Sequence, residues 1–113
     1  MHGDPLVFPP DLVLTPLEKS SWQALTRVFD PETRISLVDM GLIRSIAEGA
    51  EGRLAVVMTL TDPTCPLGDF LQESVYLKLV AQPGVSQVEI NVQLDPPWSP
   101  EDISEAGRRQ MNG

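Results

Sequence analysis

Cysteine and histidine are almost absent from this sequence of 113 residues, which holds only Cys65 and His2. One cysteine excludes an internal disulfide, and small secreted domains usually carry several, so a reducing compartment, the cytoplasm, is expected. A four-cysteine or Cys₂His₂ metal site cannot be assembled from this chain alone. A cysteine nucleophile usually needs a base nearby, and His2 stands in an N-terminal arm, so a Cys–His hydrolase is not supported.

Basic residues and long apolar runs are also scarce. Eight Lys and Arg against sixteen Asp and Glu give a formal net charge of -8, which repels a nucleic-acid backbone. A basic protein surface or a metal ion would match that charge, although acidity also serves solubility alone. No apolar run approaches the roughly 18 residues of a membrane span, and no glycine-rich phosphate loop is present. Nucleic acid, a membrane and nucleotide chemistry are therefore not expected.

Apolar residues make up 42% of the chain, enough for one hydrophobic core. Residues 1–14, with three prolines, are expected to form an extended arm, and residues 15–113 a single domain. The capping-box pattern that begins at Thr15 predicts a helix, which Asp30-Pro31 should end. We expect strands over 42–48 and 53–61, a helix over 66–82, a strand over 87–94, and a last helix that begins at Ser99.

This order, α-β-β-α-β-α, predicts a mixed α/β (α+β) domain with a three-stranded mixed sheet and helices on one face. The second strand alternates cleanly. Its core-facing set is predicted to be Leu54, Val56, Met58 and Leu60, with the intervening residues, Thr59 included, on the other side.

The loop Asp62-Pro63-Thr64-Cys65-Pro66 places the single thiol between this strand and the predicted helix. Unpaired N–H groups and the positive end of a helix favour the thiolate, which is the form of cysteine that attacks or binds metal. The alternative is a buried cysteine that acts as a small hydrophobic residue. Position alone does not decide between the two.

Three strings are more specific: Asp30-Pro31-Glu32 with Ser36-Leu37-Val38-Asp39-Met40-Gly41-Leu42-Ile43, then Met58 to Pro66, then Pro96-Pro97-Trp98. In order and spacing they resemble the SufT/PaaD-like family of iron–sulfur cluster assembly domains. The likeness runs from about Trp22 to Arg109. It implies a small α/β domain that serves iron–sulfur maturation.

The resemblance also implies a site. Its reactive or cluster-contacting set is Cys65, also the expected metal ligand, with Asp39, Thr61 and Thr64, and its border is Asp62, Glu32 and Trp98. Each has a structural alternative. Asp39 can cap a turn, the threonine hydroxyls can satisfy loop N–H groups, and Trp98 can cover the core.

The leading hypothesis is a non-enzymatic accessory or carrier protein of iron–sulfur cluster assembly. It would hold a transient cluster together with a partner, a second subunit or a small thiol, and meet the assembly machinery or client apoproteins. A weak or metal-dependent homodimer is expected.

Three alternatives stay open. The first is an accessory protein of a phenylacetyl-CoA monooxygenase-type complex. PaaD-like members tend to carry a further cysteine-containing C-terminal region, and because this chain shows none, the SufT-like role is favoured. The other two are a thiol enzyme that acts through Cys65 and a pure interaction module.

Overall fold

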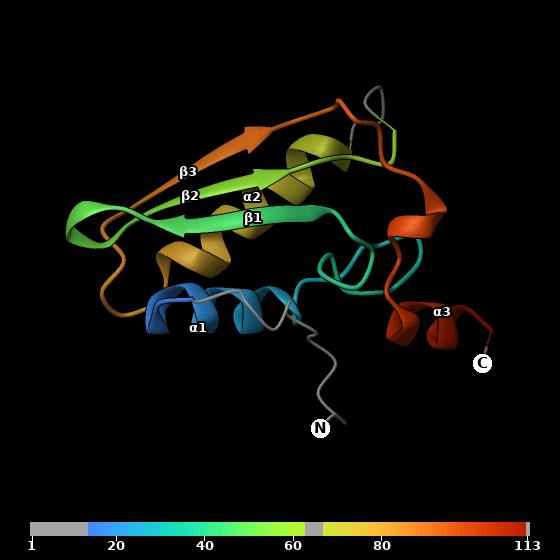
Figure 1. Ribbon diagram of the computed structural model, residues 1–113, viewed down its shortest axis with the longest axis horizontal. Coiled ribbons are helices and arrows are strands. Elements are labelled where there is room, and N and C mark those ends of the chain that lie inside the picture. The colour runs from blue at the N-terminus through green and yellow to red at the C-terminus, as the bar shows by residue number, and fades with distance from the viewer. Residues whose placement is uncertain (1–13, 63–66, 113) are drawn as a thin grey trace.

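The computed structural model describes residues 14–62 and 67–112. Its elements, in chain order, are α1 (Pro16–Leu25), β1 (Ile43–Glu48), β2 (Arg53–Met58), α2 (Leu67–Val80), β3 (Gln87–Val92) and α3 (Glu105–Asn112) (Figure 1). Short 3₁₀ turns lie at Ala50–Gly52 and Pro100–Asp102. The predicted order is confirmed. No helix in these two ranges is long and apolar enough to cross a bilayer.

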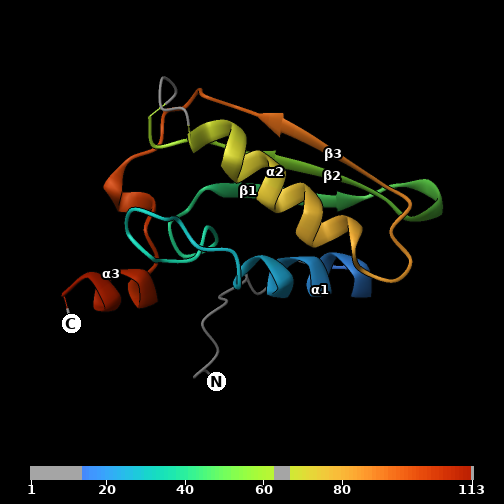
Figure 2. The same ribbon diagram turned by 180° about the vertical axis from the view of Figure 1, so that it is seen from behind.

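The three strands form one mixed sheet in the order β1-β2-β3, with β1 antiparallel and β3 parallel to the central strand. The parallel pairing requires a crossover, which α2 supplies. Figures 1 and 2 show α2 across one face of the sheet, with α1 beside it. The predicted three-stranded mixed sheet is therefore confirmed, and α1 and α2 lie on one of its faces.

The core lies between the sheet and α2. Leu54, Val56 and Met58 of β2 are buried against a set of equally buried side chains that includes Leu71, Val75 and Leu79 of α2. The alternation stops where the strand stops. Thr59, predicted to face away from the core, is completely buried, and its N–H donates to the Leu42 carbonyl at 2.8 Å beyond the end of β2.

Helix α1 begins as predicted. The Thr15 hydroxyl accepts from the Glu18 N–H, and the Glu18 carboxylate accepts from the Thr15 N–H. The helix ends at Leu25, earlier than the predicted stop at Asp30. Pairing with the loop that follows explains the difference, because Phe29 bridges to Ser36 and the Val28 carbonyl accepts from the Leu37 N–H at 2.8 Å.

The last predicted helix is divided in two. The capping box of Ser99 and Asp102 starts only a 3₁₀ turn, because Ile103 is extended and buried in the core. A second start follows. The Ser104 hydroxyl accepts from the Gly107 N–H at 3.0 Å, and α3 runs from Glu105. A buried apolar residue between the two caps thus overrides the continuous helix that the first cap predicts.

Candidate functional site

The loop after α1 carries the first string of the resemblance. Asp30 is buried, and its Oδ1 accepts from the Glu32 N–H at 2.7 Å and the Thr33 N–H at 3.4 Å. The Asp30 N–H donates to the Ile35 carbonyl at 2.9 Å, which closes the loop. An Asx turn of this kind compensates a buried carboxylate with backbone donors. It also fixes the position from which Glu32 projects.

A cleft opens between this loop and the start of α2. Its lining residues are Asp30, Glu32, Leu60, Thr61, Asp62, Leu67, Gly68 and Leu71, which surround a volume of about 10 Å³, room for about one water molecule, in a recess that is partly open to solvent. The structure therefore brings together three of the predicted residues, Glu32, Thr61 and Asp62. Cys65 and Thr64 lie outside the described residues. The residues that flank their segment, Asp62 and Leu67, both line the cleft.

The cleft is lined by both acidic and apolar side chains. Asp30, Glu32 and Asp62 supply carboxyl groups and Thr61 a hydroxyl, while the leucines give the surface between them. The carboxylates can attract a cation, and the Thr61 hydroxyl can donate a hydrogen bond to a bound sulfide. Within the described ranges, no group of three or more His, Cys, Asp or Glu side chains could hold a metal ion. The carboxylates of the cleft are thus too dispersed to form a metal centre by themselves.

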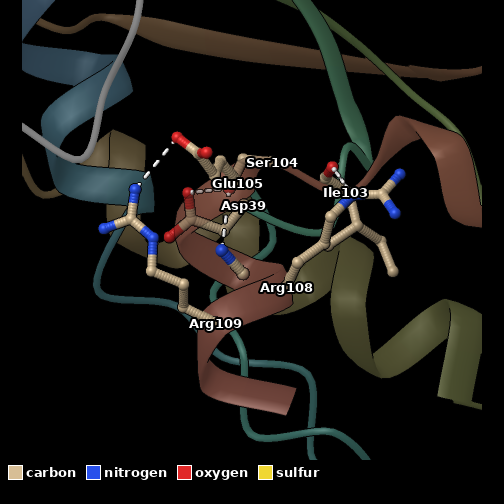
Figure 3. Close-up of polar contacts among 7 residues, drawn as sticks. Asp39, Ile103, Ser104, Glu105, Arg108 and Arg109 are labelled. Atoms are coloured by element: carbon tan, nitrogen blue, oxygen red, sulfur yellow. Dashed lines mark hydrogen bonds and ion pairs between the residues drawn. The ribbon is translucent and has the colours of Figure 1, made fainter. Parts of the chain in front are cut away.

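Asp39 is not among the residues that line the cleft. It is buried, and its two carboxylate oxygens accept from separate hydroxyls: Ser36 Oγ at 3.2 Å and Ser104 Oγ at 2.7 Å. Figure 3 shows the Asp39 side chain beside Ser104, the residue that precedes α3. The Asp39 carbonyl also accepts from the Ser104 N–H at 2.7 Å. This arrangement favours the structural alternative for Asp39, with a partner far along the chain in addition to the local turn.

Trp98 lies beside the same junction. Its indole Nε1 donates to the Met40 carbonyl at 2.6 Å, and its ring packs against the core. Trp98 therefore borders the Asp39 junction and does not line the cleft. Gly41, which follows Met40, has a φ of +77°, and its backbone lies directly against Asp102. The string Asp39-Met40-Gly41 is thus fixed by contacts to the C-terminal segment.

Arg44 occupies an irregularity of β1, since the register shifts between Ile43 and Ser45. A bulge re-aims the extra side chain. The Arg44 guanidinium crosses to the far end of β3, where it donates to the carbonyls of Gln93 and Pro96. This contact holds the segment that leads to Trp98.

Three residues in or next to the regions just described were not predicted as site residues: Asp30, Thr59 and Ser104. Asp30 and Thr59 stand inside the strings that carry the resemblance, so their presence there was the available signal. The Thr59 hydroxyl is buried and has no hydrogen-bond partner among the residues that the structure describes. Ser104 lies outside every string, and nothing local distinguishes it, because its partner Asp39 is 65 positions away.

Comparisons with known proteins identify the family of this chain. The family model described as "Iron-sulfur cluster assembly protein" matches residues 22–92. An Fe-S protein maturation auxiliary factor of Porphyromonas gingivalis is 39% identical over 94 residues, which are 83% of this chain and 90% of that protein.

An iron-sulfur cluster carrier protein of Synechocystis is 38% identical over 73 residues, which are 65% of this chain but only 20% of that protein. A crystal structure of a DUF59 domain from Bacillus anthracis superposes with a TM-score of 0.81 at 28% identity, covering 85% of this chain and 92% of the other. The resemblance to SufT-like assembly domains is confirmed. This chain belongs to the iron–sulfur cluster assembly protein family.

Proposed function

We propose that this protein is an accessory factor of iron–sulfur cluster assembly that holds a cluster transiently, with Cys65 as its thiolate ligand. Membership of the family supports the role in assembly. The similarity to a carrier protein supports transient handling of a cluster. The cleft is the observation that supports the proposed site, because Asp62 and Leu67, the described residues on either side of the Cys65 segment, both line it.

The cluster is cargo in this proposal. Biological clusters take about four protein ligands, and one cysteine supplies only one thiolate. A partner, a second subunit or a small thiol completes the set. Incomplete coordination suits a protein that must release what it holds. The hydroxyls of Thr61 and Thr64 would donate hydrogen bonds to sulfur, while Glu32 and Asp62 would supply negative charge near iron.

Asp39 has a different role in the proposal. Its two carboxylate oxygens already accept hydrogen bonds from Ser36 and Ser104. We therefore infer that Asp39 is a positioning residue, which holds the loop that carries Asp30 and Glu32 at its other end. Trp98 assists from the same junction through its bond to Met40.

The partners in this proposal are the iron–sulfur assembly machinery or client apoproteins, and the compartment is the cytoplasm. A single cysteine agrees with a reducing compartment. Where a second subunit completes the coordination, the protein should form a homodimer only when loaded with iron and sulfide.

Anaerobic reconstitution with iron and sulfide tests the proposal. The wild-type protein should develop a thiolate-to-iron absorption band that Cys65→Ser loses. Glu32→Gln and Thr61→Val should lower the amount of cluster retained, since both residues line the cleft. Glu89→Gln is the matched control, because Glu89 is an exposed carboxylate on β3 that does not line the cleft.

Two results would contradict the assignment. If Cys65→Ser keeps the full band, another group holds the iron. If Glu32→Gln and Thr61→Val behave as the Glu89→Gln control does, the cleft has no part in binding. Light scattering before and after loading, with Cys65→Ser alongside, separates a bridging cluster from association through the protein surface.

A further inference from the structure

Helix α2 is apolar on both of its sides. Leu71, Val75 and Leu79 face the core, and each is buried. On the opposite side Phe70 and Leu77 are 54% and 57% exposed. A helix that only covers a sheet is expected to be polar on its outer side, and a helix that is apolar all round is normally covered on both sides. In the described parts of this chain, only one side of α2 is covered.

The outward apolar residues are aligned. Phe70 and Leu77 are seven residues apart, so they project from the same line along the helix. Ser74 lies between them, and its hydroxyl donates to the Phe70 carbonyl at 2.9 Å, which satisfies the hydroxyl within the helix. We call Phe70, Ser74 and Leu77 the outer stripe. Figure 2 shows α2 on the near side of the domain, with no other helix or strand crossing it.

Charge restricts what can cover the outer stripe. The exposed residues Asp69 and Glu73 stand on one side of it, with Lys78 on the other. The whole chain has a formal net charge of -8. Two copies of such a chain repel one another, whereas a basic partner is attracted. The complementary surface is therefore apolar, with lysine or arginine on the side that meets Asp69 and Glu73.

We propose that the outer stripe docks an amphipathic helix of a partner protein, with apolar residues at helical spacing and basic residues beside them that face Asp69 and Glu73. When two helices pack in this way, the apolar residues in contact are three, four and seven positions apart along each helix. Few large apolar side chains take part, so the complex should be weak and reversible.

The position of the outer stripe gives the docking a consequence. Leu67 and Leu71, each within one helical turn of Phe70, line the acidic cleft. A helix seated on Phe70 would therefore lie next to the mouth of the cleft. The docking surface itself is independent of cluster binding, since none of the outer stripe lines the cleft. It can be tested in the apo protein.

Two fluorescent synthetic peptides of about four helical turns serve as probes. Both carry leucines at the helical spacing. One has lysines at the flanking positions and the other has glutamates there. Fluorescence anisotropy of each peptide measures binding to the wild type, to the double variant Phe70→Ser/Leu77→Ser, and to the control Met111→Ser. Met111 is also an exposed apolar residue on a helix, 56% exposed, and it lies on α3.

The basic peptide should bind the wild type and Met111→Ser equally, and the double variant at least about tenfold more weakly. The acidic peptide should bind little, and added salt should weaken the basic one. Circular dichroism checks that the double variant keeps its fold, as expected for two exposed positions.

Equal binding of the basic peptide to wild type and double variant would overturn the proposal, and so would equal binding of the two peptides to the wild type. Light scattering tests the other occupant. A dimer that the double variant converts to a monomer would show that the outer stripe is an interface between two copies of this chain.

Discussion

Asp39 and Ser104 bind each other through both main chain and side chain. The Asp39 carbonyl accepts from the Ser104 N–H at 2.7 Å, and the Asp39 Oδ1 accepts from the Ser104 hydroxyl at 2.7 Å. Because the same hydroxyl caps α3 by accepting from the Gly107 N–H, one serine links a buried carboxylate to a helix start. The last helix is thereby attached to the loop that carries the family motif.

Ser104→Ala should detach α3 from this loop. The substitution removes an N-cap and leaves one oxygen of the buried Asp39 carboxylate without its partner, so we expect a loss of about 2 kcal/mol in unfolding free energy. Urea denaturation measures the loss. Trypsin should also cut at Arg108 and Arg109 faster, because cleavage needs α3 to open.

Glu105→Gln provides the control for this variant. It changes the neighbouring residue and removes only the exposed ion pair between Glu105 and Arg109. Exposed pairs contribute from nothing to about 1 kcal/mol, so stability and the cleavage rate should change little. Equal behaviour of Ser104→Ala and Glu105→Gln would show that the bond to Asp39 does not hold the helix.

The Glu18 carboxylate gives the stability of this domain a dependence on pH. Its pKa lies below the ordinary value of 4.5, first because it accepts from the Glu48 N–H and second because it accepts from the Thr15 N–H. A depressed folded-state pKa means that the stabilisation is complete above the unfolded value and is lost as pH falls through the folded value.

Glu18→Gln should therefore be less stable than the wild type at pH 7, by at most about 1 kcal/mol because the site is partly open to solvent. The two proteins should converge as the pH falls below 4.5, the ordinary value for this carboxyl. Urea midpoints at a series of pH values give the comparison. A difference in stability between wild type and variant that stays constant with pH would show that the Glu18 carboxyl is not a source of the pH dependence.

Local patterns were enough to predict the architecture. The capping box at Thr15 and the period-two alternation of Leu54, Val56 and Met58 are properties of neighbouring residues, and each marks the element that the structure contains. The predictions fail where a contact outside the local pattern decides the structure. Helix α1 stops early because Phe29 pairs with Ser36. The last helix is interrupted because Ile103 enters the core.

The predictions for the candidate site are also correct for some residues and not for others. Glu32, Thr61 and Asp62 could be placed together only through the resemblance, because no spacing rule joins residues 32 and 61, and they do line one cleft. Asp39 was grouped with them for the same reason, yet its side-chain partners are Ser36 and Ser104. A pair separated by 65 positions leaves no periodic signal in a single sequence.

Gly41→Ala should be strongly destabilising. The residue has a φ of +77°, and a Cβ there would lie 2.4 Å from the Asp102 carbonyl oxygen, so the C-terminal segment must move. We expect a loss of more than about 2 kcal/mol. Gly84→Ala separates the two causes, because Gly84 has a φ of +88° and, apart from its chain neighbours, no described residue has an atom within 4 Å of the new Cβ. Equal losses in the two variants would show that contact with Asp102 is unimportant.

Thr59 offers a test of whether the fold gives up stability for function. Its side chain is completely buried, and its hydroxyl has no hydrogen-bond partner within residues 14–62 and 67–112. An unpaired buried hydroxyl costs about 1–3 kcal/mol, and valine has nearly the same shape, so Thr59→Val should raise the free energy of unfolding by about 1 kcal/mol.

Thr33→Val is the opposite case, because the Thr33 hydroxyl oxygen accepts from the Ile35 N–H at 3.3 Å and its removal should destabilise. Urea denaturation shows whether each variant is more or less stable than the wild type.

Anaerobic reconstitution of Thr59→Val measures the effect on cluster binding. Thr59 directly precedes Leu60 and Thr61, which line the cleft. A more stable Thr59→Val protein that retains less cluster would mean that the hydroxyl is kept for cluster handling. A destabilised Thr59→Val protein would mean that the hydroxyl is paired in solution, and the functional explanation would then lose its basis.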